Sequence, residues 1–460
     1  MKRVLVVAYY FPPIGGGGVQ RTVKFCRYLL EFGYQPVVVT GPGGATDIWA
    51  PEDATLAHEI PPEVEVHRVP GPEPAALAKW RRRADRMLDL TPATLRWWVD
   101  GATSLGRSVG RDADLVFGEL VPYATARAAA RVAADLRKPW VADLQDPWAL
   151  DEMWLYPSLL HRRRDTARMR RLLGSARAIV MNTPEASARV RGRFPELADR
   201  VVEAIPNGYD PADFERAEPT SRQERRFRIV HTGTMHTEWG LQLRRMRRLR
   251  RLLGGMPEPG VDFLTRSHVF LLEAVERLLE RDPTLRDVIE VHLAGALTEA
   301  DRAVAARSPV TRLHGYVSHS GTISLMLAAD LLFLPMHDLP AGVRAGLVPG
   351  KAYEYLGSGR PILAAVPEGD ARDLLVAAGN ASICSPGDVA AMAELLSERI
   401  AAWRDRREPA PPDPDVLAPF GRRAQAERLA RVFDNALGER ATALSPAARG
   451  RAVSNGARAT

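Results

Sequence analysis

One stretch in the second half of the chain combines residue types that suit anion binding. It reads Gly346-Leu-Val-Pro-Gly-Lys-Ala-Tyr-Glu-Tyr-Leu-Gly-Ser-Gly-Arg-Pro-Ile-Leu-Ala-Ala365, which predicts a loop, a short helix over 351–356 and a buried strand. Lys351 lies in the first turn of this helix, where free N–H groups attract anions and the helix dipole disfavours a cation. An anion such as a diphosphate in front of the helix would explain this lysine. The alternative is a solvated lysine at a helix start.

Glycine-rich turns follow predicted strands in both halves of the chain. The strand over 3–8 leads into four glycines at 15–18, then a helix and a strand over 36–40. Gly16 and Gly17 would let the backbone approach a ligand at the helix N-terminus. The strand over 228–232 leads into a second small-residue turn, Thr232-Gly233-Thr234. Neither GxGxxG nor GK[ST] occurs here, which argues against a nicotinamide, flavin or P-loop site; a merely flexible turn is the alternative.

Two carboxylates follow a predicted strand over 140–142. They are Asp143 and Asp146, in the run Asp143-Leu-Gln-Asp-Pro-Trp148. Ligands of open α/β sheets bind beyond the carboxyl ends of the strands, so both side chains are in a favoured position. Asp146 could orient or deprotonate a hydroxyl group. Alternatively, an Asp before Pro only caps the next turn.

The composition is that of an ordinary soluble protein with two or three domains. The 460 residues are 46% hydrophobic and 26% charged, and no apolar run approaches the ~18 residues of a membrane span. Met1-Lys-Arg leads directly into a strand, so we expect a cytoplasmic protein. The net charge of +7 is modest and gives no reason to expect a nucleic-acid partner. Cys26 and Cys384 lie in apolar segments and imply no disulfide framework.

Two basic segments stand apart from this average. Residues 79–98 combine arginines with Trp80, Trp97 and Trp98, and residues 241–260 carry six arginines, at 244, 245, 247, 248, 250 and 251. Arginine-rich helices with tryptophans can lie against anionic lipid headgroups. The alternative is that the tryptophans are in the core and the arginines are solvated.

The alternation of strands and helices predicts two α/β domains. A strand over 200–205 closes the first of them, and Pro206-Asn-Gly-Tyr-Asp210 forms a tight turn between the two. We expect an N-terminal, acceptor-side domain over 1–206 and a C-terminal, donor domain over 207–420. A helix over 421–440 would pack back on the first domain, and residues 441–460 would be a disordered tail.

The order of these motifs resembles the retaining glycosyltransferases of family 4, in particular those that build bacterial polysaccharides. The resemblance covers about residues 1–440 and rests on the pieces Pro12-Pro13 with Gly15 to Gly18 and Arg21, Asp143 to Trp148, Pro206 to Asp210, His231 to Thr234, and Val348 to Ile362. It implies the GT-B fold: two Rossmann-like domains facing each other across a cleft, with C-terminal helices crossing back to the N-terminal domain.

The resemblance also implies roles for individual residues. Glu354 would hold the ribose of the donor, and Lys351 and Arg266 would neutralise its diphosphate. Catalysis would depend on Lys351, Asp146 and Arg266. The remaining donor contacts would come from Gly16, Gly17, Thr232, Gly233 and Thr234, and the acceptor side from Asp143, Asp146 and Arg21. The sequence departs from the family at two places: Gly346 replaces the first glutamate of E-x7-E, and the Asp143/Asp146 segment replaces an acceptor-side histidine.

The expected activity is transfer of a sugar from a nucleotide-diphosphate sugar, UDP-linked, to a hydroxyl acceptor with retention of configuration. We expect no metal ion and no cofactor, because the histidines are scattered and no DxD motif follows a suitable strand. The acceptor could be a glycan, a lipid-linked molecule or a small molecule, reached by peripheral contact with the inner membrane face. A non-catalytic sugar-nucleotide-binding homologue and a peripheral membrane scaffold are the alternatives. The sugar, the acceptor and the oligomeric state stay open at this point.

Overall fold

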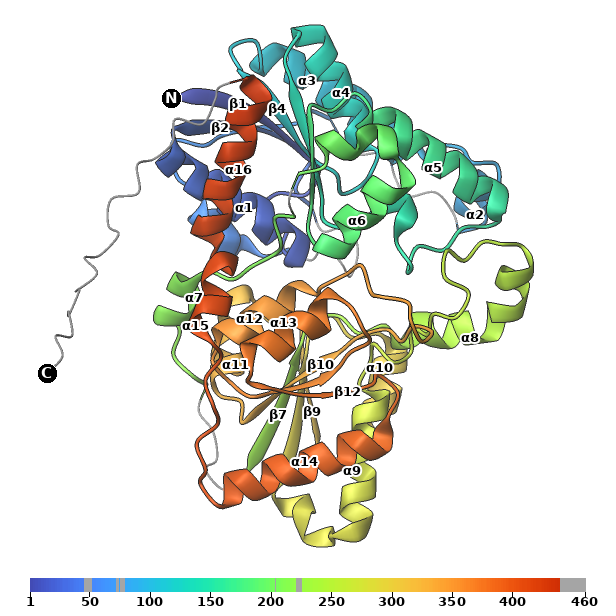
Figure 1. Ribbon diagram of the computed structural model, residues 1–460, viewed down its shortest axis with the longest axis vertical. Helices are drawn as coiled ribbons and strands as arrows, with labels where there is room; N and C mark the ends of the chain where they lie inside the picture. The colour runs from blue at the N-terminus through green and yellow to red at the C-terminus, as the bar shows by residue number, and fades with distance from the viewer. Residues whose placement is uncertain (45–51, 72–73, 75–78, 203, 221–225, 439–460) are drawn as a thin grey trace, which may run out of the picture.

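Two α/β domains are stacked along the long axis of the molecule (Figure 1). The computed structural model describes residues 1–44, 52–71, 74, 79–202, 204–220 and 226–438. The tail that the sequence predicts to be disordered, 441–460, lies outside the described residues. Each domain is built on a six-stranded parallel sheet. An apolar core lies on either face of each sheet, as parallel sheets require.

The first domain has the strand order β3-β2-β1-β4-β5-β6. Its strands are β1 (Lys2–Ala8), β2 (Tyr34–Thr40), β3 (Glu65–Arg68), β4 (Leu115–Glu119), β5 (Trp140–Leu144) and β6 (Ala178–Met181). Its helices are α1 (Gly17–Leu29), α2 (Lys79–Met87), α3 (Ala93–Val109), α4 (Thr125–Leu136), α5 (Leu159–Leu173) and α6 (Pro184–Arg193), with the 3-10 turns η1 (Leu30–Phe32), η2 (Ala54–Glu59), η3 (Trp148–Leu150) and η4 (Pro195–Arg200).

The second domain has the strand order β12-β11-β10-β7-β8-β9. Its strands are β7 (Phe227–Thr232), β8 (Ile289–Ala294), β9 (Thr311–Gly315), β10 (Leu331–Pro335), β11 (Ile362–Ala365) and β12 (Ala381–Cys384). Its helices are α7 (Pro211–Glu215), α8 (Thr237–Leu252), α9 (Val269–Arg281), α10 (Glu299–Ala305), α11 (His319–Leu327), α12 (Gly350–Gly357), α13 (Asp370–Ala378) and α14 (Val389–Arg404), with η5 (Pro283–Asp287).

The chain crosses between the domains twice, at neighbouring points. After α15 (Pro414–Leu417) and η6 (Ala418–Phe420), helix α16 (Arg422–Leu437) returns to the first domain, where Phe433 packs in its core. The Tyr209 N–H donates to the Phe420 carbonyl at 3.1 Å, so the two crossings are bonded side by side. A Cβ at Gly208 would lie 2.0 Å from that carbonyl, so only glycine fits there. Two Rossmann-like domains with a helix crossing back confirm the predicted GT-B fold.

The strand predicted over 200–205 is wrong. Val201 forms only an isolated bridge with Ile179. The Arg191 guanidinium donates to the Val201 carbonyl at 2.8 Å and to the Val202 carbonyl at 3.2 Å, so side-chain donors take the acceptors that a further strand would use.

Other expectations concern membranes and cysteines. Within the described ranges, every helix is too short or too polar to cross a membrane. Cys26 and Cys384 are buried free thiols, in agreement with the prediction of no disulfide framework.

Candidate functional site

Basic side chains converge at the carboxyl ends of β7 and β10, where the second domain meets the first. We call Lys351, Arg266, His231 and His236 the cation cluster. Lys351 is in the first turn of α12, and its Nζ lies 3.1 Å from Nε2 of His231. Nδ1 of His231 donates to the Phe333 carbonyl at 2.9 Å, which leaves Nε2 as an acceptor for the lysine. Among the residues that the structure describes, neither Lys351 nor Arg266 forms a salt bridge.

Burial and mutual repulsion set the protonation of the cation cluster. Burial, aided by the charge of Arg266, lowers the pKa of Lys351 to about 7. Burial and the charge of Lys351 hold the pKa of His231 well below its usual value, so this histidine is neutral. Burial and the charges of Arg266 and Lys351 hold the pKa of His236 well below its usual value. Positive charge that is partly buried without an ion-pair partner is costly, and Lys351 and Arg266 have none among the described residues, so this cluster could bind an anion.

The turn after β7 is shaped to make room for Lys351. Gly233 has φ +94, and a Cβ there would lie 2.8 Å from Nζ of Lys351. The Thr232 N–H donates to the Tyr355 hydroxyl at 2.9 Å, which fixes the turn against α12. Thr232 is buried, whereas Thr234 is partly exposed and free to contact a ligand. The structure therefore brings together the predicted residues of this turn and Lys351.

Arg266 connects the cation cluster to the first domain. Its Nη1 donates to Sδ of Met153 at 3.3 Å, and its carbonyl accepts from the His236 N–H at 3.0 Å. Burial raises the pKa of Asp146, and the charge of Arg266 opposes this rise, which places the two side chains near each other. The turn after Asp146 has Pro147 at its N-cap and no side-chain cap. The capping alternative for Asp146 therefore does not hold, and a hydroxyl could be bound between Asp146 and the cation cluster.

Glu354 lies one turn along α12 from Lys351 and faces a different group of polar residues. Its carboxylate is 15% exposed, and its Oε1 lies 3.9 Å from Nδ1 of His319. His319 is held by Asp213 at 3.1 Å and by Gln20 of α1 at 2.8 Å. Burial raises the pKa of Glu354, and the charges of His319 and Arg422 oppose that shift. This carboxylate retains acceptor capacity for hydroxyl groups such as those of a ribose.

The glycine turn of the first domain lies at the same boundary. Gly16 has φ +98, and α1 begins at Gly17. The Gln145 side chain donates to the Gly18 carbonyl at 2.9 Å and to Glu119 at 3.0 Å, which joins the glycine turn to the end of β5. The helix N-terminus is thereby held beside the segment that carries Asp146.

Arg21 and Asp143 form a wholly buried, bidentate ion pair, with bonds of 2.8 and 2.9 Å. Arg21 also donates to the Pro206 carbonyl at 2.8 Å. The sequence placed both residues on the acceptor side. Because both side chains are buried and bonded to each other, they can contribute to an acceptor site only by fixing the end of β5 and the crossing at Pro206.

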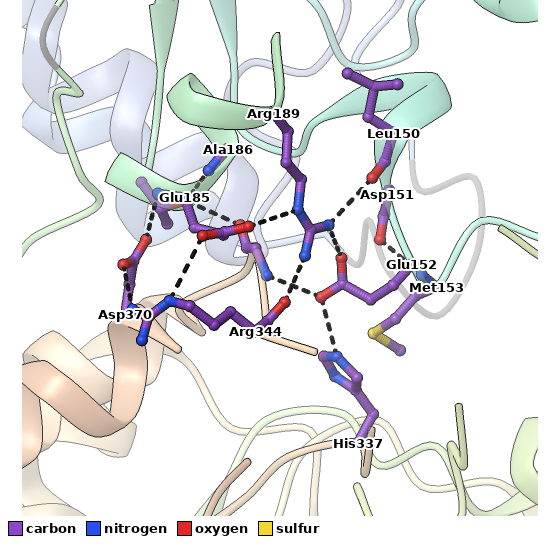
Figure 2. A network of polar contacts seen from close by, with 12 residues as sticks. Leu150, Asp151, Glu152, Met153, Glu185, Ala186, Arg189, His337, Arg344 and Asp370 are labelled. Carbon is purple, nitrogen blue, oxygen red and sulfur yellow. Dashed lines mark hydrogen bonds and ion pairs between the residues drawn. The ribbon is translucent and has the colours of Figure 1, made fainter. Parts of the chain in front are cut away.

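A second charged network joins the domains beside the cation cluster (Figure 2). We call Glu152, Arg189, His337, Arg344 and Gly346 the clasp. Glu152 accepts hydrogen bonds from the Arg189 guanidinium, from His337 at 3.2 Å and from the Gly346 N–H at 3.0 Å. Burial opposes ionisation of Glu152, but the donors His337 and Arg189 outweigh it and hold its pKa at about 2.

The clasp explains the glycine that replaces the first glutamate of E-x7-E. A Cβ at Gly346 would lie 2.8 Å from Nη1 of Arg189, so a longer side chain at this position would displace the guanidinium. Arg189 is held by Glu185 at 3.1 Å and by the carbonyls of Leu150 at 3.1 Å and Arg344 at 2.5 Å (Figure 2). A carboxylate is still present here, but Glu152 of the first domain supplies it.

Several residues of this boundary were not predicted from the sequence as site residues. They are His319, Glu152, Arg189, Asp151 and Glu119. His319 and Glu152 each contact partners more than a hundred residues away in sequence, so local spacing gave no signal for them. Burial and the charge of Asp146 raise the pKa of Asp151 well above its usual value. The charge of Asp151 also acts on Arg266, as those of Asp146 and Glu152 do, so three carboxyl groups lie near this guanidinium.

Each domain matches a known family. The model of Glycosyltransferase Family 4 matches residues 15–213, and that of Glycosyl transferases group 1 matches residues 263–401. No curated protein matches the chain. The two family matches, one in each domain of the observed fold, support a GT-B glycosyltransferase.

Solved structures of similar fold span nearly the whole chain. Anabaena Alr3699/HepE in complex with UDP and glucose is 16% identical, with TM-score 0.56, covering 94% of this chain and 100% of that one. The trehalose-6-phosphate phosphatase N-terminal domain of Candida albicans is 13% identical, with TM-score 0.59 and coverages of 95% and 97%. UDP-GlcNAc 2-epimerase of Methanocaldococcus jannaschii is 10% identical, with TM-score 0.53 and coverages of 95% and 100%. At these identities the likeness concerns the fold alone.

Proposed function

We propose that this chain transfers a sugar from a UDP-sugar to a hydroxyl group of an acceptor, with retention of configuration and without a metal ion. The cation cluster is the observation that carries the proposal. Lys351 and Arg266 lie partly buried at the carboxyl edge of the second sheet, without a salt bridge in the described part of the chain. A diphosphate would supply the ion-pair partner at bonding distance that neither side chain has among the described residues.

The two cations would act on the leaving group. Negative charge builds on the diphosphate as its bond to the sugar breaks, and preorganised cations stabilise such charge most in a buried site. Because Lys351 and Arg266 supply positive charge where a divalent ion would otherwise act, we propose that no metal ion is needed. Glu354 would accept hydrogen bonds from the ribose hydroxyls, and the turn at Gly16 and Gly17 would lie beside the transferred sugar.

Retention follows from attack on the face from which the diphosphate leaves. The bond from the anomeric carbon to the phosphate oxygen breaks, and a bond from that carbon to the acceptor oxygen forms on the same side. The acceptor proton passes to a phosphate oxygen of the departing UDP. The resemblance of the sequence motifs to retaining glycosyltransferases is the reason for proposing this stereochemistry. Asp146, beside Arg266, would orient the acceptor hydroxyl.

A thermal-shift panel of nucleotide diphosphates and their sugars, with and without EDTA, tests donor binding. A ligand at a hundredfold excess over its Kd stabilises the fold by about 2.7 kcal/mol. We expect UDP and one or more UDP-sugars to raise Tm equally with and without EDTA. No shift with any nucleotide would contradict the proposed donor site, and a shift abolished by EDTA would contradict metal independence.

Lys351→Ala tests whether the cation cluster acts on the diphosphate of the donor. We expect kcat/KM to fall by about a hundredfold or more, because one preorganised donor to a developing anion is lost. Lys138→Ala is the matched control, since Lys138 precedes β5 at the opposite end of the first sheet. A loss below about threefold would rule out the proposed role of Lys351.

The second candidate function is a non-catalytic sugar-nucleotide-binding protein. Gly346 is the observation that favours it, because E-x7-E lacks its first carboxylate. Donor binding without transfer and without slow donor hydrolysis would support this candidate. Transfer, or hydrolysis that Lys351→Ala abolishes, would exclude it.

A further inference from the structure

Large hydrophobic side chains are exposed on three segments of one side of the molecule. They belong to α2 and the residues after it, to the start of α5, and to the end of α8. We call this surface the α2/α5/α8 face. The most exposed are Leu252 at 83% and Trp80 at 72%, and the face also includes Leu88, Leu160, Leu249 and Leu253. Trp98, by contrast, is buried in the core, where its indole N–H donates to the Thr125 hydroxyl at 3.0 Å. Of the two alternatives for the tryptophans, contact with lipid or a place in the core, Trp98 therefore follows the second.

The three segments form one continuous surface. Nε2 of His161 in α5 lies 3.0 Å from the Met87 carbonyl of α2. The Leu159 N–H donates to the Leu253 carbonyl at 2.9 Å, and the Tyr156 N–H to the Gly255 carbonyl at 2.8 Å. Figure 1 shows α2, α5 and α8 on the same side of the molecule, across the boundary between the domains. The α2/α5/α8 face therefore belongs to both domains.

Arginines flank these hydrophobic side chains. Met246 and Leu249 of α8 and Leu253, which caps it, share one face by their spacing. Around the same helix Arg245 lies between Leu249 and Leu252, and Arg248 lies just beyond Leu252. Arg245, Arg248 and Arg251 are exposed and form no salt bridge within the described ranges. Exposed arginines also follow Leu160 in α5, at 163 and 164, and lie in α2, at 82 and 86. Apolar side chains bordered by unpaired arginines complement a membrane surface with anionic headgroups.

We propose that the α2/α5/α8 face docks on an anionic lipid bilayer, with its leucines and Trp80 in the interfacial layer and its arginines on lipid phosphates. Side chains as exposed as Leu252 and Trp80 project from convex helices, as insertion into a soft bilayer requires. A folded protein partner would instead be recognised by pockets at the centre of an interface. A nucleic acid would leave the leucines without a role.

This face leads directly to the cation cluster. Met153, which accepts a hydrogen bond from Arg266, lies six residues before Leu159 in the chain. At the start of α8, the ring of His236 lies 5.8 Å from that of Trp239, which is 48% exposed. A hydroxyl held in the bilayer under the face would be presented to the site between these two segments. The inference deepens the proposed function, on which it rests, by naming a lipid-linked acceptor.

Vesicle sedimentation tests the docking. The probes are vesicles of phosphatidylcholine alone and of phosphatidylcholine mixed with phosphatidylglycerol, at low and high salt. We expect the full chain to bind the anionic vesicles about tenfold or more tightly than the neutral ones, and less tightly at high salt. Binding to neither vesicle, or equal binding to both, would overturn the proposal.

Paired substitutions on the two domains test whether the face acts as one surface. Leu249→Gln with Leu252→Gln, and separately Trp80→Gln with Leu88→Gln, should each weaken binding to anionic vesicles by about tenfold or more. Leu313→Gln with Val376→Gln is the matched control, because these side chains are exposed elsewhere, on β9 and α13. Unchanged vesicle binding in both test variants would overturn the proposal. So would RNA binding that displaces the vesicles and is insensitive to the leucine substitutions.

The thermal shift caused by UDP separates this proposal from the proposed function. We expect the variants of the face to retain the full UDP shift, which also shows that they fold. Vesicle binding without any UDP response would leave the docking surface valid and contradict the transferase. A UDP response without vesicle binding would contradict the docking and the lipid-linked acceptor only.

Discussion

The cation cluster and the clasp are two charged regions at the same domain boundary, and they differ in how their charges are paired. In the clasp, each guanidinium and carboxylate has a partner at hydrogen-bond distance, and Glu152 is bonded on three sides (Figure 2). In the cation cluster, within the part of the chain that the structure describes, the hydrogen-bond partner of Lys351 is the neutral His231, and that of the Arg266 guanidinium is a methionine sulfur. The paired charges of the clasp suit a structural role, whereas partly buried cations with no carboxylate at bonding distance among the described residues suit the proposed binding of a diphosphate.

The largest effect on stability should come from breaking the clasp. Arg189→Met would leave Glu152 buried without its main counter-ion, so we expect the free energy of unfolding to fall by about 3 kcal/mol. Urea titration of the unliganded protein measures this loss. Arg163→Met, an exposed arginine outside the clasp, is the control and should stay within about 0.5 kcal/mol of wild type. If the free energy of unfolding of Arg189→Met falls no further than that of the control, the clasp contributes little to the stability of the fold.

Lys351→Met should have the opposite signature. It removes a partly buried cation that forms no ion pair with the described residues, so the unliganded protein should be as stable as wild type or more stable. Affinity for UDP should fall about thirtyfold or more, because a charge-assisted contact to the diphosphate is lost. Calorimetric titration with UDP measures the loss of affinity, and urea titration without UDP measures the stability of the unliganded protein. A loss of stability equal to that of Arg189→Met would remove the distinction between the two regions.

The pH dependence of UDP binding should report Lys351. Its pKa is about 7 in the unliganded protein, and a bound diphosphate would raise it. Between these two pKa values binding takes up one proton, so affinity should fall about tenfold per pH unit above pH 7. Calorimetry at several pH values measures this slope, and proton uptake should appear as a dependence on buffer ionisation enthalpy. Lys351→Arg should flatten the slope, since arginine stays charged; an unchanged slope would assign the proton to another group.

The smallest effect should come from Gly346→Ala. Its Cβ would press on the Arg189 guanidinium, and we expect a cost of about 1 kcal/mol because a flexible side chain can shift. The UDP thermal shift should stay unchanged, because the substitution affects the clasp and spares the cation cluster. A neutral substitution would mean that the clasp adapts, and the steric account of the missing glutamate would be wrong.

Much of the fold was readable from the sequence because its strands are continuous apolar runs bounded by Gly and Pro. The strand predicted over 200–205 failed because arginine side chains take its carbonyl groups: Arg191, ten residues before Val201, and Arg428, from far along the chain. Lys351 could be singled out by its misfit with the helix dipole, a local signal. Glu152 and His319 could not, since their roles come from partners in the other domain. The burial of the Arg21–Asp143 pair likewise depends on a contact across 122 residues.

The two chain crossings at Tyr209 and Phe420 restrict how the domains can move. Because they are hydrogen-bonded side by side, and Arg422 N–H also donates to the Tyr209 carbonyl at 3.0 Å, they behave as one short hinge and not as two independent tethers. If the domains separate, they must rotate relative to each other about this hinge. The clasp and the α2/α5/α8 face bridge the domains away from that hinge. A bilayer bound to both domains through the face would therefore restrain the rotation that admits the donor.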